Sequence, residues 1–188
     1  MEKELLAALE VLRAGGLILY PTDTVWGIGC DATNAEAVEK IYKLKRSENK
    51  HSMLVLCRDA DMIVRYVNKA PGIAFEVMDM SEQPLTLILE GAVNVAKNLI
   101  PDEGTLGVRV PNHDFCHQLL RRFGKPIVST SANISGEPTP LKGLQEVSRE
   151  IIDGVDFVVN PRFQGKPTCK PSSIIRFGER GEVEIIRK

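Results

Sequence analysis

The 188-residue sequence predicts an α/β fold: one domain over 1–188, with a twisted mixed β-sheet, flanking helices and a central concave cleft. Short apolar runs of strand length interleave irregularly with segments whose apolar residues recur at helical spacing, which favours a mixed sheet over a regular doubly wound one. Small hydroxyl side chains follow several of these strands, where α/β proteins commonly bind ligands. The length is suited to a single domain with a substantial core.

Composition indicates an ordinary globular protein, with 43% hydrophobic and 26% charged residues and a formal net charge of −1. This balance gives no sign of a nucleic-acid or membrane protein. The four cysteines lack zinc-ligand spacing, and His113, Cys116 and His117 lack a matching fourth donor, so packing is favoured over metal binding there. We expect a cytoplasmic protein with reduced thiols, because no signal peptide or membrane-spanning apolar run is visible.

The chain opens with a predicted helix followed by a buried strand. Leucines recur at helical spacing from Leu5 to Leu12, and the glycines from Gly15 end this helix. The apolar run 17–20 reads as a strand that ends at Pro21, because proline cannot donate to a sheet ladder.

A second helix is predicted to begin at a capping box formed by Thr33 and Glu36, and to end near Lys45. The remaining elements follow from apolar runs, alternation and turn residues. Strands are predicted at 53–57, 84–89, 105–110, 126–129, 155–159, 173–176 and 183–187, and helices at 70–80, 115–124 and 144–152.

Two hydroxyl-rich stretches follow predicted strands. The first begins with Thr22, Asp23 and Thr24 and runs into Trp26 and two nearby glycines; an ordinary β-turn explains it equally well when it is taken alone. The second runs over 129–136, and its polar side chains could cradle phosphate or carboxylate oxygens, with a turn or helix cap as the alternative. Its polar residues are Ser129, Thr130, Ser131, Asn133 and Ser135.

Cations lie near the same predicted strand ends. Lys45 and Arg46 could neutralise a polyphosphate, although solvated cations are also favoured at a helix C-terminus. Arg109 lies in a largely apolar strand and needs a counter-anion, which is either an internal carboxylate or a ligand carboxylate. Ser172 adds a further hydroxyl before a strand. Together these residues indicate a cleft for an anionic nucleotide and a small amphoteric molecule.

Six motifs, in order along nearly the whole chain, resemble those of the YrdC/Sua5/YciO family. They are YPTDTVWG at 20–27, IYKLK at 41–45, PLTLIL at 84–89, TLGVRVP at 105–111, SANISG at 131–136 and PSSII at 171–175, followed by a terminal arginine, Arg187.

The resemblance implies a threonylcarbamoyl-AMP synthase, a nucleotidyltransferase that uses ATP, bicarbonate and L-threonine, with Mg²⁺ as the expected metal ion. Its product would supply the t6A modification of tRNA. Lys45 and Arg109 would be catalytic, acting by alignment and charge stabilisation. The implied threonine site consists of Thr24, Arg109, Ser129 and Ser172. The implied ATP site consists of Lys45, Arg46, Thr105, Ser131, Asn133, Thr139 and Arg187.

The chain departs from the family pattern in two places. Ser47 stands where the family usually has the arginine of Lys-x-Arg, and Arg46 could substitute from the adjacent position. His51 and Ser52 replace an Asn-Pro or similar pair, and the C-terminal extension of the longer Sua5 proteins is expected to be absent. The alternatives are a YciO-like paralogue with weak or no synthase activity and a module that binds tRNA or double-stranded RNA. We also expect Arg109→Ala to abolish threonine use with little loss of fold.

Overall fold

The computed structural model describes residues 1–47 and 53–188, and these form the following elements. The helices are α1 Glu2–Arg13, α2 Ala35–Lys45, α3 Ala60–Ile63, α4 Gly72–Met80, α5 Asp114–Phe123 and α6 Arg149–Asp153, with 3₁₀ turns η2 Lys97–Leu99, η3 Leu144–Glu146 and η4 Pro161–Phe163. The strands are β1 Ile18–Tyr20, β2 Gly27–Gly29, β3 Leu54–Leu56, β4 Val67–Lys69, β5 Leu85–Ala92, β6 Thr105–Arg109, β7 Ile127–Ser131, β8 Phe157–Val158, β9 Ser173–Phe177 and β10 Val183–Arg187.

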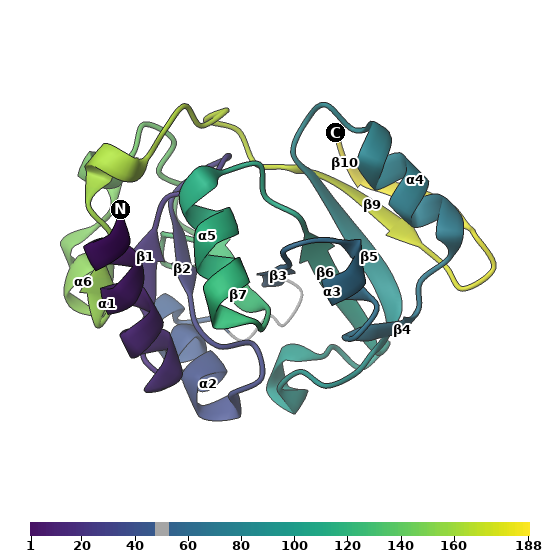
Figure 1. Cartoon of the computed structure of the whole chain (residues 1–188), viewed down its shortest axis with the longest axis horizontal. Coiled ribbons are helices and arrows are strands. Elements are labelled where there is room, and N and C mark those ends of the chain that lie inside the picture. The colour runs from purple at the N-terminus through teal and green to yellow at the C-terminus, as the bar shows by residue number, and fades with distance from the viewer. Residues whose placement is uncertain (48–52) are drawn as a thin grey trace.

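The strands of the described residues form one ten-stranded sheet in the order β10-β9-β5-β6-β3-β7-β2-β1-β8, with β4 added beside β5. Parallel pairs join β1 to β8, β3 to β6 and β5 to β9, and the other pairs are antiparallel. The sheet is twisted and carries helices on its faces (Figure 1). The predicted mixed α/β fold is therefore confirmed.

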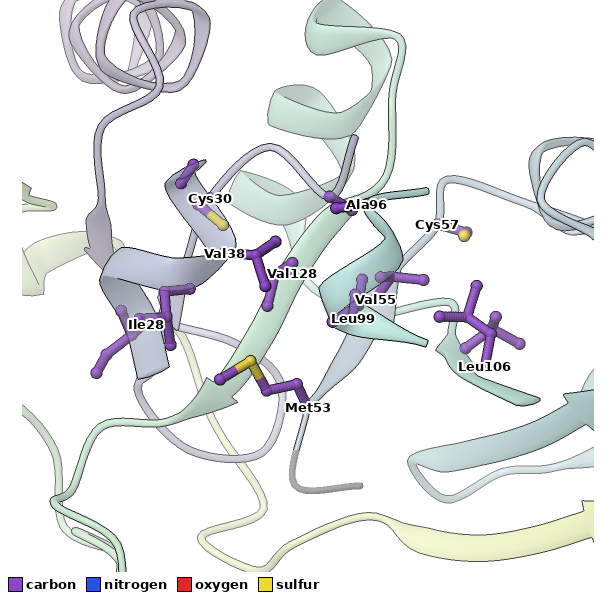
Figure 2. Close-up of a cluster of buried hydrophobic side chains, with 14 of the residues drawn as sticks. Ile28, Cys30, Val38, Met53, Val55, Cys57, Ala96, Leu99, Leu106 and Val128 are labelled. Carbon is purple, nitrogen blue, oxygen red and sulfur yellow. The ribbon is translucent and has the colours of Figure 1, made fainter. Parts of the chain in front are cut away.

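Both faces of the sheet around β1 are covered by helices. Ile18 and Tyr20 pack in a cluster with residues of α1 and α5, which lie side by side, as Figure 1 shows. Leu19, which points to the opposite face because side chains alternate along a strand, packs in the cluster that contains Val38 of α2. Figure 2 shows Val38 close to Val128 of β7 in this cluster.

The sheet around β5 has one apolar face and one polar face. Leu85, Leu87 and Leu89 are buried in the same cluster as Ala74 of α4. The intervening Thr86 and Ile88 point to the other face and line a cavity. This period-two alternation provides one wall of the candidate site described below.

Several predicted elements need correction. The cap of α2 is Asn34, whose side chain accepts from the backbone N–H groups of Glu36 and Ala37, whereas Thr33 bonds to Asp31. The predicted capping box is therefore wrong, because the adjacent asparagine reaches the same N–H groups.

The predicted helix 144–152 is divided into η3 and α6, since Ser148 acts as the N-cap of a new helix that begins at the next residue. His51 and Ser52 lie outside the described residues.

The strand β2 was not predicted, because its glycines suggested a loop. Its register places Gly29 opposite Ile18, in a site with no room for a side chain. A Cβ atom at Gly29 would lie 2.7 Å from Cε1 of Tyr20 and 2.8 Å from the backbone oxygen of Val128. Close backbone approach thus explains the glycine here.

Gly29→Ala is therefore expected to lower the free energy of unfolding by about 1–3 kcal/mol, because the backbone oxygen of Val128 cannot move away without disturbing β7. Urea unfolding provides the measurement. The matched control is Gly72→Ala at the start of α4, where a Cβ would meet nothing within 4 Å and alanine is the better helix former. Equal unfolding midpoints for the two variants would contradict the packing argument.

Candidate functional site

A cavity of about 350 Å³ lies between strand ends from many parts of the chain. Its size suits a small-molecule ligand. Most of the residues predicted for a ligand site line it, and these are Thr24, Thr105, Arg109, Ser129, Ser131, Thr139, Ser172 and Arg187. Among the described residues, Lys45, Arg46 and Asn133 are the predicted residues that do not line it.

Arg109, at the end of β6, forms a buried ion pair with Asp23. One guanidinium nitrogen, Nη2, donates to Oδ1 of Asp23 at 3.0 Å, and Nη1 donates to Oγ1 of Thr24 at 3.0 Å. The other oxygen of Asp23 accepts from the backbone N–H of Asn112. The sequence left two possible counter-anions for Arg109, an internal carboxylate and a ligand carboxylate. The structure shows that it is the internal carboxylate of Asp23. The Nε–H of Arg109 is buried without a partner among the described residues.

The hydroxyl groups beside this pair form an ordered chain of hydrogen bonds. Thr22 Oγ1 lies 2.8 Å from the backbone oxygen of Val25 and 2.9 Å from Oγ1 of Thr24. Since a hydroxyl has one proton, the Thr22 proton goes to Val25 and the Thr24 hydroxyl donates to Thr22. Thr24 Oγ1 then accepts from Arg109. Thr22 and Thr24 therefore both stabilise the turn after β1 and supply polar groups to the cavity wall.

The opposite wall joins Ser172 to β5 and β10. The hydroxyls of Ser172 and Thr86 lie 2.7 Å apart, and Nε of Arg187 donates to the backbone oxygen of Ser172 at 2.9 Å. The pKa of Arg187 is lowered by its burial and then by the positive charge of Arg109. Two guanidinium groups near one cavity favour an anionic ligand.

Lys45 supports the 131–135 loop from behind. Its Nζ donates to the backbone oxygens of Ser131 and Asn133, at 2.6 and 2.5 Å, and its own backbone oxygen accepts from the N–H of Ser135. The side chain is buried, and this burial lowers the pKa of Lys45 to about 8. Asn133 likewise donates to Ile134 and Glu137 within its own loop.

Arg46 points away from the cavity. It ends α2 in the left-handed conformation, with φ of 52°, and its Nη2 lies 2.6 Å from Oε1 of Glu150 at the surface. The expectation that Arg46 substitutes for a neighbouring cation in an ATP site therefore needs correction, because the turn at the helix end directs its side chain to α6. Ser47, the next residue, is buried.

Some lining residues were not among the predicted site residues. Thr86 is the polar side chain in the apolar run 84–89, and that interruption is the signal that could have identified it. Trp26 also lines the cavity, although its long-range partner, Gln164, leaves no local pattern. His113 and Cys116 form packing contacts instead: His113 Nε2 lies 3.0 Å from the backbone oxygen of Gln164, and Cys116 Sγ donates to that of Pro21.

The described residues contain neither a candidate metal site nor a candidate membrane span. No group of three or more His, Cys, Asp or Glu side chains is arranged to hold a metal ion. In the same part of the chain, the helices are too short or too polar to cross a membrane.

Comparisons with known proteins identify relatives of this chain and of its fold. A model of the Sua5/YciO/YrdC family, described as telomere recombination, matches residues 10–188. Threonylcarbamoyl-AMP synthase from Pseudoalteromonas translucida is 32% identical over 89% of this chain and 90% of its own length. The crystal structure of E. coli YciO has a TM-score of 0.85 and 26% identity, covering 100% of this chain and 90% of that one. P. abyssi Sua5, crystallised with L-threonine, shares the fold, with a TM-score of 0.85 and 24% identity over 94% of this chain and 52% of its own.

The buried amine of Lys45 makes a pH-dependent contribution to stability. Its pKa of about 8 in the folded protein lies below its ordinary value of 10.5, so between these values the unfolded chain binds more protons. The free energy of unfolding should therefore rise with pH in this window, by up to about 1.4 kcal/mol per pH unit relative to Lys45→Met. Urea unfolding of both proteins at pH 7 to 10 measures this slope, and parallel curves would contradict it.

The Arg109–Asp23 pair corrects the expectation that Arg109→Ala leaves the fold almost intact. Removing the guanidinium leaves a buried carboxylate without its counter-ion, which should lower the free energy of unfolding by about 3–5 kcal/mol. Combining Arg109→Ala with Asp23→Asn should recover part of this loss, because the unpaired charge is then absent. Urea unfolding of the single and double variants tests this, and a fully additive double variant would argue against the pair.

Proposed function

The chain belongs to the Sua5/YciO/YrdC family, and on that basis we propose that it is an L-threonylcarbamoyladenylate synthase acting as a single domain. The supporting observation is the convergence of Thr24, Arg109, Ser131 and Ser172 on one cavity of suitable size. These residues come from segments far apart in the sequence, and they supply the cations and hydroxyls that a nucleotide and an amino acid require.

In this proposal the threonine carboxylate binds at the guanidinium of Arg109, beside the hydroxyls of Thr24, Ser129 and Ser172. ATP binds in the same cavity, next to the threonine. Its phosphates interact with Ser131 and Arg187, and Thr105 and Thr139 complete the lining. Lys45 and Asn133 act indirectly, by holding the loop that carries Ser131.

The proposed chemistry needs no nucleophile from the protein. Bicarbonate and the threonine amine combine to an N-carboxylate with loss of water, and a carboxylate oxygen then attacks the α-phosphorus of ATP and displaces pyrophosphate. The protein contributes alignment of the two ligands and stabilisation of the charge that develops on the phosphate. The product would pass to the machinery that forms t6A in tRNA, in the cytoplasm.

Mg²⁺ fits this site only as a companion of ATP. Asp23, which lies between the lining residues Thr22 and Thr24, is committed to Arg109 and to the N–H of Asn112. The described protein residues thus offer no free carboxylate ligand there, and the ion would be held by ATP phosphates and water, as is usual for Mg²⁺. When bound, it would neutralise phosphate charge.

A second candidate is a YciO-like protein that retains the cavity but forms little adenylate. The placement of Arg46 favours it, because this cation is turned toward Glu150 and Ser47 follows it in the chain. A reduced affinity for the triphosphate is the expected consequence.

A pyrophosphate-release assay with ATP, L-threonine and bicarbonate distinguishes these functions. The synthase should release pyrophosphate only when all three are present, and release independent of threonine would contradict the proposal.

Thr24→Val should lower kcat/KM for threonine by roughly 10- to 100-fold, because Arg109 loses a buried acceptor beside the carboxylate subsite. The control is Ser81→Ala at the end of α4, outside the cavity lining, which should leave both substrate profiles unchanged.

A further inference from the structure

Trp26 is the single tryptophan of the chain, and it forms part of the cavity wall. Its side chain is 2% exposed, so its indole N–H needs a partner within the protein. That partner is Oε1 of Gln164, at 2.7 Å and 138 positions along the chain. The backbone oxygen of Trp26 accepts from the N–H of Ala132, which places the residue beside the 131–135 loop.

Gln164 also contacts two other segments near the cavity. Its backbone oxygen lies 3.0 Å from Nε2 of His113, the residue that precedes α5. Its side-chain amide packs against Gly143, where a Cβ atom would lie only 2.7 Å from Oε1. Gly143 is four residues beyond Thr139, which lines the cavity. Gln164 therefore joins Trp26, the start of α5 and the loop after Thr139.

Residues 164–172, which we call the crossing segment, run from Gln164 to Ser172 across the turn that follows β1. The N–H groups of Thr168 and Cys169 donate to the backbone oxygens of Asp23 and Thr24, at 2.9 and 3.1 Å. The segment ends at Ser172, whose hydroxyl meets Thr86 in the cavity. Gln164 is thus the first of several attachments that hold this segment against the site.

We propose that Gln164 is a positioning residue for the reaction, a role that rests on the proposed synthase function. Its side chain fixes the buried Trp26 indole, and Trp26 lines the cavity next to the strand pair that carries Ser131, a residue assigned to ATP. Without this acceptor, the buried indole N–H has no partner in its present position and the wall must rearrange. The effect should therefore appear in the binding of ATP more than in the binding of threonine.

The test combines kinetics with the fluorescence of the single tryptophan. Gln164→Met keeps the backbone bond to His113 but removes the acceptor, and should raise KM for ATP about 10-fold while altering the Trp26 emission of the ligand-free protein. Gln164→Glu retains an acceptor oxygen and should stay within about 3-fold of the wild-type KM. Phenylalanine has no indole N–H, so in a Trp26→Phe background Gln164→Met should change KM for ATP by less than about 2-fold.

Three results would overturn the role of Gln164. The first is that Gln164→Met changes neither KM for ATP nor the Trp26 emission. The second is that Gln164→Met changes KM for ATP equally in the wild-type and Trp26→Phe backgrounds, and the third is that it lowers stability in urea without changing KM for ATP. These three results can be interpreted only if the wild-type protein releases pyrophosphate in the presence of threonine. If the wild-type protein lacks this activity, the proposed function is wrong, and the kinetic role of Gln164 is wrong with it. Failure of the proposed function is therefore distinguished from failure of the Gln164 role by the wild-type assay.

Discussion

The buried contact of Arg109 with Asp23 and Thr24 links the end of β6 to the turn after β1, and the cavity exists where these two segments meet. Both charged side chains are almost fully buried, at 4% and 8% exposure. Separating the two side chains would leave an uncompensated buried charge, so the pair favours this arrangement of the two segments strongly over others. This holds even if the pair contributes little to the free energy of unfolding. The same arginine also lines the cavity. The fold and the shape of the candidate site consequently depend on one side chain.

Lys45 illustrates a different use of a buried cation. Its ammonium is directed at the backbone oxygens of Ser131 and Asn133 and not at the cavity, although the side chain occupies a position where the family resemblance implied contact with ATP. A loop that follows a strand has carbonyl groups without partners in the ladder, and a buried amine can satisfy two of them at once. Ser131, which lines the cavity, is thus fixed through its backbone by a residue outside the cavity lining.

The parts of the site that the sequence predicted are those that depend on strand order and alternation. Thr24 follows one apolar run, Arg109 lies near the end of another and Ser172 precedes a third, so hydroxyls and a cation were expected at strand ends around one cleft. The family resemblance then implied that these three residues share a threonine site. The direction of the Arg46 side chain depends instead on the left-handed backbone conformation of Arg46 itself at the end of α2, which no periodic pattern in the sequence predicts. The counter-anion of Arg109 was left open for a similar reason: Asp23 is compatible with a turn, a ligand site or an ion pair, and only the tertiary structure distinguishes them.

Long-range pairs are the hardest feature to predict, and they are also what makes the turn after β1 rigid. This turn is held by Arg109 and by the backbone N–H groups of Thr168 and Cys169, while Trp26 at its end is held by Gln164. A wall fixed by several such contacts loses little conformational freedom when a ligand binds, so less binding free energy is consumed in ordering it. Because the contacts come from segments more than eighty positions apart, this preorganisation is a property of the whole sheet and not of any single motif.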